Sequence, residues 1–366
     1  MKRFLFLVVF MVIAASLVMA GGSAEESAEE VVEKREITYV DQNFSYTKAA
    51  AAAFKEHVER ETDGVITVTV LPWDALGGDR DVIEQLVLGE VEVFNATTGS
   101  LSGEVPEVQM TNMPFLFENR YIGWELFEDP EYLKYVQNYW LENSNNKIRL
   151  LGGAENSIRN LYTVRGPVKV PADLEKYNIK MRVPQIPMYV NLWDALGAPA
   201  IVSISASERY SALQSGLMDG TEGGLASAWP AGLLEICDYV TLTGHMFDHH
   251  YYVINNDFYE SLSPEFQEVI DEAGALAAKV QSVGVQISEG ESLQLMKDAD
   301  KVIYEPTSQE KGEWREVGVR VGTELLSDIV PQEYMDKTFE AVDRVKDNLD
   351  MAEIESEKDQ LSKYID

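Results

Sequence analysis

The chain has few positively charged residues for its length. Only 30 of its 366 residues are Lys or Arg, against 62 Asp or Glu, so its formal net charge is −32. A protein that binds nucleic acid needs basic surface to contact phosphate groups, and one that binds anionic membrane needs it for the lipid headgroups. The charge therefore excludes nucleic acid and anionic membrane surfaces as partners.

Reactive side chains are also scarce. Cys237 is the only cysteine, so no internal disulfide can form, and its apolar surroundings in LLEICDYV predict a small buried side chain. The chain has four histidines, and it contains no Gly-x-Ser-x-Gly elbow, phosphate-binding loop or Cys-x-x-Cys pair. We therefore expect no catalytic residues, no resident metal and no cofactor. An exported enzyme is the less favoured alternative.

Long apolar runs are absent except at the N-terminus. Lys2 and Arg3 are followed by an uncharged apolar run, residues 4–17. VMA (residues 18–20) then places small residues at the −3 and −1 positions of a cleavage site. The run is short for a bilayer span, which takes about 20 apolar residues. The pattern therefore predicts a secretory signal peptide, residues 1–20, cleaved after about Ala20, and a periplasmic protein.

Two further segments offer little apolar surface to bury. Residues 21–36 contain six Glu, which predicts a disordered acidic spacer after the signal peptide. Residues 346–366 are charged and only weakly apolar, which predicts a C-terminal tail or frayed helix.

The remainder alternates between strand and helix patterns. Strands are predicted at residues 37–40, 65–70, 91–96, 147–153, 178–183 and 249–256. Helices are predicted at residues 47–61 and 80–88, the second capped by Asp79 and ended by Gly89. SASE (residues 205–208) is a capping-box pattern that opens another helix. This alternation is typical of the α/β class with a largely parallel sheet.

One helix is much longer than the others. It begins at Pro264 after Ser263 and continues to about Val302, so it must lie across the molecule. We predict two α/β lobes bridged by strands and by this helix, as in periplasmic binding proteins, with a ligand cleft between the lobes. Lobe I takes residues 37–156 plus about 245–285, and lobe II takes residues 157–244 plus about 286–345.

Several motifs resemble one family. They are LGGDRDVIEQL (residues 76–86), ENSIRNLY (155–162), IKMRVPQIPMYVNLWDALGA (179–198) and SASERYSALQSGLMDGTE (205–222). Over about residues 37–340 the chain resembles the solute-binding proteins of TRAP transporters. The resemblance implies an exported receptor that captures a small organic anion and delivers it to the membrane subunits of a sodium-coupled carrier.

The ligand that the resemblance implies is a sugar acid, a hydroxy acid or a dicarboxylate, and a monomeric receptor is expected. The solute-binding protein of an ATP-driven importer is an alternative, because it would share the fold and the export signal.

The resemblance also implies ligand-binding residues. Arg182 stands where the family places an arginine at the carboxyl end of a strand, and a guanidinium makes two parallel hydrogen bonds to a carboxylate. Arg159 matches a second ligand-facing arginine, with a structural salt bridge as the competing interpretation. Glu222 is expected to hold a polar ligand group, a cation or a hinge contact, or else to be a structural acid.

Four further positions complete the predicted site. Gly223 replaces the Asn or aromatic residue that the family often uses against the ligand, so it should leave space and a pocket of different size. Asp41, Asp79 and Thr97 lie at strand ends or turns and would suit the hydroxyl groups of a sugar acid. For Asp79, capping a helix is an equally good interpretation.

Overall fold

The computed structural model describes residues 34–204 and 208–365. Three predicted segments lie outside the described residues: the signal peptide, the acidic spacer up to residue 33 and most of the SASE motif. Lys34 is the first described residue, and the last residues of the predicted spacer already belong to the first strand, which begins at Arg35.

The described residues contain one mixed sheet of nine strands. Its order is β2-β1-β3-β8-β4-β7-β5-β6, and β9 pairs with β8. The strands are β1 Arg35–Asp41, β2 Ile66–Pro72, β3 Val93–Thr97, β4 Ile148–Thr163, β5 Lys180–Val183, β6 Ala200–Ser203, β7 Gly220–Gly224, β8 Tyr239–Asn255 and β9 Val302–Tyr304.

Two long strands join the two lobes of this sheet. β4 and β8 run antiparallel over 16 and 17 residues and are buried along most of their length. The parallel strands β2, β1 and β3 attach to the C-terminal part of β8, whereas β7, β5 and β6 attach to the C-terminal part of β4. Each lobe therefore has its own parallel strands, and the predicted two-lobe α/β fold is confirmed.

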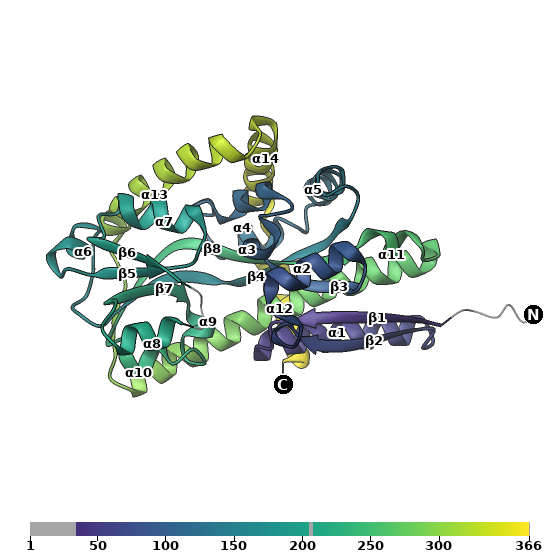
Figure 1. Cartoon of the computed structure of the whole chain (residues 1–366), viewed down its shortest axis with the longest axis horizontal. Helices are drawn as coiled ribbons and strands as arrows, with labels where there is room; N and C mark the ends of the chain where they lie inside the picture. The colour runs from purple at the N-terminus through teal and green to yellow at the C-terminus, as the bar shows by residue number, and fades with distance from the viewer. Residues whose placement is uncertain (1–33, 205–207, 366) are drawn as a thin grey trace, which may run out of the picture. The chain divides into compact units, whose positions relative to one another are not determined.

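Fifteen α-helices surround the sheet in the described residues (Figure 1). They are α1 Ser45–Glu61, α2 Asp79–Leu88, α3 Thr98–Leu101, α4 Arg120–Glu125, α5 Pro130–Asn143, α6 Ala172–Lys176, α7 Pro187–Ala195, α8 Arg209–Gln214, α9 Leu225–Ala228, α10 Leu233–Ile236, α11 Asn256–Glu260, α12 Pro264–Asp298, α13 Ser308–Ile329, α14 Gln332–Asn348 and α15 Met351–Leu361. None of the described helices is long and apolar enough to cross a membrane.

The predicted long helix is α12, which has 35 residues. Ser263 caps it by accepting a hydrogen bond from the backbone N–H of Phe266, and Pro264 occupies its first position. Small residues let it approach other elements: a Cβ at Gly284 would lie 2.7 Å from the Cβ of Tyr46 in α1. In Figure 1, α12 extends from beside α11 to beside α10, so it contacts both lobes.

The predicted N-cap of α2 differs from the structure. Asp79 does not cap α2, because Gly78 is the N-cap and Asp79 is the first helical residue. The backbone of Gly78 has a φ of 126°, a conformation that favours glycine, and this turn starts the helix one residue earlier. Gly89 does end the helix in the left-handed region, as predicted.

The end of the chain is a packed helix and not a loose tail. Asp350 caps α15 by accepting hydrogen bonds from two backbone N–H groups, and Ile354 and Leu361 of α15 are buried. The few apolar residues of this charged segment are therefore enough to hold it on the protein. Cys237 is also buried, in an apolar cluster with Tyr162 and Val240, as its surroundings predicted.

Candidate functional site

Arg182 lies near the carboxyl end of β5, between β6 and β7. Its side chain is only 2% exposed. One terminal nitrogen, Nη2, donates a hydrogen bond to the backbone oxygen of Ile204 at 2.5 Å, and Nε is buried without a hydrogen-bond partner. A buried donor without a partner is costly, so this guanidinium is incompletely satisfied by the described residues.

A second buried arginine, Arg209, is the first residue of α8 and is 8% exposed. Its Nη1 lies 3.2 Å from the position that a Cβ on Gly223 would occupy. The guanidinium of Arg209 therefore borders the space that the glycine leaves, and a pocket of different size at Gly223 stays a prediction. A Cβ at residue 223 would require Arg209 to shift slightly.

Arg159, in contrast, is fully paired. Its Nε and Nη2 donate to the two carboxylate oxygens of Glu222 at 2.5 and 2.7 Å, and its Nη1 donates to Asp248 at 2.7 Å. The sheet register explains the first pair: Arg159 lies opposite Gly224 of β7, so Glu222 is its diagonal neighbour on the same face. The competing interpretation of Arg159 as a salt-bridge residue therefore describes its contacts in this structure.

The ion pairs of Arg159 with Glu222 and Asp248 continue into hydrogen bonds with neutral side chains from other elements. Asp248 accepts hydrogen bonds from Asn156 at 3.0 Å and Asn112 at 3.3 Å. The hydroxyl of Tyr46, at the start of α1, donates to Asn156 at 3.3 Å. This network connects α1 of lobe I with β4 and, through Arg159, with β7 of lobe II.

The electrostatic surroundings of Arg159, Arg182 and Arg209 differ. Burial opposes ionisation of Glu222, but the charge and hydrogen bonds of Arg159 outweigh it and hold the pKa of Glu222 well below its usual range. Burial, and then the neighbouring positive charge of Arg209, lower the pKa of Arg182 to about 10. Burial and the charge of Arg159 likewise lower the pKa of Arg209. All three remain charged at neutral pH.

In the part of the chain that the structure describes, no carboxylate is paired with Arg182 or Arg209. Two buried positive charges thus lie together without a negative partner, beside a third that already has two. We call Arg159, Arg182 and Arg209 the arginine cluster. Buried charges are normally paired, so this cluster has the chemistry of a site for an anion.

The chain matches a family model on sequence. The model is described as "Bacterial extracellular solute-binding protein, family 7", and residues 38–327 match it. The chain belongs to this family. Its members include the TRAP-type solute-binding proteins that the sequence motifs resemble, and the predicted family is confirmed.

Curated relatives share about a third or less of their residues with this solute-binding protein. A solute-binding protein of Roseobacter denitrificans is 31% identical over 72% of this chain and 78% of its own length. The C4-dicarboxylate-binding periplasmic protein of Rhodobacter capsulatus is 28% identical over 76% of this chain and 82% of its own. In an uncharacterised Sinorhizobium fredii protein, 31% identical, the matched region is only 42% of that protein's length.

Solved structures have the same fold as this solute-binding protein. A TRAP periplasmic solute-binding protein from Ochrobactrum anthropi superposes with a TM-score of 0.78 at 25% identity, over 87% of this chain and 98% of the other. A sugar-acid-binding protein from Advenella mimigardefordensis, in complex with galactonate, superposes with a TM-score of 0.75 at 24% identity, over 85% of this chain and 99% of the other.

The remaining predicted site residues of this solute-binding protein lie in lobe I. Thr97, the last residue of β3, donates its hydroxyl to Asp79 at 3.1 Å, so these two are brought together. Asp41, the last residue of β1, is buried and accepts hydrogen bonds from the Thr47 hydroxyl and the Asn43 backbone N–H. Asp41 therefore holds the start of α1. Among the described residues, none of these three hydrogen-bonds to the arginine cluster.

Two residues of this arrangement were not predicted. Arg209 is a charge on the buried face of α8, three and four residues before the buried Ala212 and Leu213. Asp248 is an acidic residue inside the largely buried strand β8, between Phe247 and His249. In both cases the signal is a charged side chain within a largely buried element, because such residues usually have a buried partner or a ligand.

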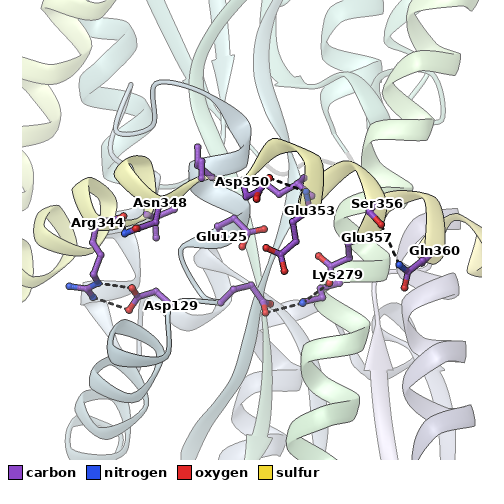
Figure 2. A pocket seen from close by; sticks show the side chains of 14 residues that line it. Glu125, Asp129, Lys279, Arg344, Asn348, Asp350, Glu353, Ser356, Glu357 and Gln360 are labelled. Atoms are coloured by element: carbon purple, nitrogen blue, oxygen red, sulfur yellow. Dashed lines mark hydrogen bonds and ion pairs between the residues drawn. The ribbon is translucent and has the colours of Figure 1, made fainter.

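A cavity of about 660 Å³ lies elsewhere in this solute-binding protein, among α4, α12, α14 and α15 (Figure 2). Its lining is rich in carboxylates, and its cations are already paired: Arg344 with Asp129, and Lys279 with Glu128 and Glu357. Figure 2 shows Glu125 between these two groups of ion pairs. Since no cation of this acidic cavity is left without a carboxylate, it does not suit an organic anion.

Proposed function

We propose that this protein is the extracytoplasmic receptor of a sodium-coupled TRAP carrier, and that Arg182 holds a carboxylate of its small organic anion. The observation that carries the proposal is the state of Arg182, which is buried and charged, with Nε unpartnered and no carboxylate paired to it. A ligand carboxylate would satisfy the free N–H and balance the charge in one step.

The other predicted residues have supporting roles in this proposal. Glu222 and Asp248 hold Arg159 in place, and Arg159 in turn adds positive potential beside Arg182. Asp79 and Thr97 form a hydrogen-bonded pair whose remaining oxygen lone pairs would accept from ligand hydroxyls, which favours sugar acids and hydroxy acids. The similar protein from Advenella mimigardefordensis is in complex with a ligand of this chemical class, galactonate, whereas the Rhodobacter capsulatus relative is named for C4-dicarboxylates.

The fold supports capture by closure of the lobes. β4 and β8 are the strands that link them, and both change register between Glu155 and Leu161, where β4 has two irregularities. Register shifts interrupt the ladder and let a strand bend. We propose that the lobes close on the ligand by bending there, and that the protein acts as an exported monomer after its signal peptide is removed.

A thermal unfolding screen tests this function. The purified mature protein is heated with aldonates, uronates, keto acids, hydroxy acids and dicarboxylates in turn. A ligand that binds only the folded state at 100 times its Kd adds about 2.7 kcal/mol of stability, which raises the melting temperature by several degrees.

Arg182→Ala is the matched control for this screen, because a true ligand should lose most of its stabilising effect in that variant. A panel in which no acid stabilises the wild-type protein would overturn the proposal, as would a ligand that stabilises both proteins equally.

A further inference from the structure

We propose that contacts on the rear face of the hinge, made by Phe115 and Arg315, limit the affinity of this receptor by opposing closure of its lobes. The rear face is the face of β4 and β8 opposite to the one that carries Arg159. This inference rests on the function proposed above, because it takes binding to be coupled to closure. It makes Phe115 and Arg315 determinants of affinity that act through the hinge.

The alternation of side chains along β4 and β8 separates the two faces. Ile158 lies opposite Phe247 in a stretch of regular register. Neighbouring side chains of a strand project to opposite faces, so Arg159 and Asp248 lie on one face, and Ile158 and Phe247 lie on the rear face. On the rear face the ring of Phe247 packs edge-on against Phe117, with 5.3 Å between the ring centroids. Bending that brings the lobes together over Arg159 must therefore separate them over Phe247.

A cavity of about 440 Å³ spans the two lobes on this rear face, and we call it the rear cavity. Residues 115–120 of lobe I line one side of it, and Ile158 and Phe247 of the hinge strands also line it. The other side is one stripe of α13, because the lining residues of that helix follow a spacing of three to four: Ser308, Lys311, Gly312 and Arg315.

Helix α13 is held on lobe II. The indole nitrogen of Trp314 donates to the backbone oxygen of Lys169 at 2.9 Å. The same indole packs edge-on against Trp193 of α7, with 6.1 Å between the ring centroids. The two sides of the rear cavity therefore belong to different lobes, and closure over Arg159 should widen the rear cavity.

Phe115 joins the two sides of the rear cavity and the hinge. Its backbone N–H donates to the carbonyl oxygen of His245 in β8 at 3.1 Å, and its own carbonyl accepts from Nη1 of Arg315 at 3.0 Å. Its ring would lie only 2.8 Å from a Cβ at Gly318 of α13. The φ of Phe115 is 58°, which is rare for a bulky residue and persists only where the surroundings fix it. Closure must therefore stretch or break the contact of Phe115 with Arg315.

Filling the rear cavity tests this inference. A Cβ at Gly312 meets no atom within 4 Å and projects from the stripe of α13 that lines the rear cavity, so a phenyl ring there opposes narrowing of the rear cavity. Gly312→Phe should raise the closed fraction and lower the Kd by about 3- to 10-fold, since the apparent Kd falls in proportion to that fraction. Calorimetry with galactonate, or with the acid that the thermal screen ranks above it, measures the change. Gly290→Phe is the matched control, because Gly290 is a helical glycine of α12 that also has open space around it and lies outside the rear cavity.

Removing the contact between the lobes should act in the same direction. Arg315→Ala deletes the hydrogen bond to the Phe115 carbonyl, so it should lower the Kd by about 2- to 3-fold. Truncation of a residue with only a structural role would weaken binding or leave it unchanged. Tighter binding is therefore the result that distinguishes control of closure from support of the fold.

Distances between spin labels report closure without ligand. Leu88→Cys in lobe I and Leu217→Cys in lobe II place the labels at positions that are 74% and 54% exposed. The native Cys237 is buried and stays unlabelled. In the unliganded protein, Gly312→Phe should shift the distances toward those of the wild-type protein with bound galactonate or the acid that the thermal screen ranks above it. Melting temperatures confirm that each variant is folded.

The outcomes separate this inference from the proposed function. If no acid of the panel binds the wild-type protein, the proposed function fails and this inference fails with it. If an acid binds but either Gly312→Phe or Arg315→Ala fails to tighten binding, control from the rear face is wrong while the function of Arg182 stands. The same conclusion follows if Gly290→Phe tightens binding equally, or if Gly312→Phe leaves the label distances unchanged.

Discussion

The arginine cluster and the acidic cavity concentrate charge in opposite ways. In the cluster, Arg182 and Arg209 are almost completely buried and have no carboxylate partner among the described residues. In the cavity, every cation has at least one carboxylate partner, and the remaining acids reach solvent. Whether a region suits an anion therefore depends less on the sign of its summed charge than on how deeply its charged side chains are buried and whether they are paired.

This comparison explains how a protein of net charge −32 is expected to bind an anion. Exposed charges are screened by salt over about 8 to 10 Å, so the acidic surface weakly opposes ligand approach from a distance. Inside the arginine cluster the local dielectric is low, and two unpaired guanidinium groups dominate at contact distance. The surface acids serve solubility, and in the proposed function the arginine cluster binds the anion.

The largest expected effect is on folding, and it comes from the paired arginine. Arg159→Met should lower the free energy of unfolding by about 3 to 5 kcal/mol, because it leaves Glu222 and Asp248 buried without their cation. Urea unfolding of the unliganded protein measures this change. Arg182→Met is the matched control and should not destabilise the unliganded protein, since it removes a charge that has no partner. Equal losses in both variants would contradict the distinction between paired and unpaired arginines.

The next effect is on binding. Arg182→Ala should weaken binding by about 2 to 5 kcal/mol for an organic acid that the screen has identified, because the ligand carboxylate would be buried without its partner. Calorimetry with that acid measures the change. An unchanged affinity would show that Arg182 does not contact the carboxylate.

A smaller effect is expected in the acidic cavity, as a dependence on pH. Burial, then the negative charges of Glu128 and Glu357, raise the pKa of Glu125 from 4.5 to about 7. A raised pKa in the folded state means that the stability from this group is fully present below pH 4.5 and is lost as the pH rises through 7.

Glu125→Gln removes this titration. Relative to the wild-type protein it should gain on the order of 1 kcal/mol above pH 7 and little at pH 4.5, after allowance for solvent screening of a half-exposed group. Unfolding in urea across this pH range measures the difference. Two stability curves that stay parallel would show that Glu125 titrates at its ordinary pKa.

The smallest effect concerns the ion pair at the edge of the acidic cavity. Arg344 makes two hydrogen bonds to Asp129, at 2.6 and 2.8 Å, but its side chain is 33% exposed. Arg344→Ala should therefore lower the unfolding free energy by only about 0.2 to 1 kcal/mol, and high salt should reduce the difference further. A loss as large as that of Arg159→Met would contradict the claim that burial decides what a pair contributes.

The sequence was sufficient for several of the elements and for the family. Alternating apolar patterns located β1, α1, α2 and the start of α12 to within two residues, because these depend on local periodicity and on caps such as Ser263. Motifs around Arg182 indicated the family, which the comparison confirmed. The lengths of β4 and β8 were underestimated, since their polar middle sections are strand only through pairing with each other.

The sequence by itself determined the fold class, the family and the presence of several arginines near strand ends, because each is written in contiguous residues. Only the tertiary structure decided which arginine is neutralised. Arg159 meets Glu222 and Asp248 from positions 63 and 89 residues away in the chain, and Arg209 reaches the space above Gly223 from a separate helix. Pairing and burial of charge depend on distance in space, and strand register sets that distance for residues far apart in the sequence.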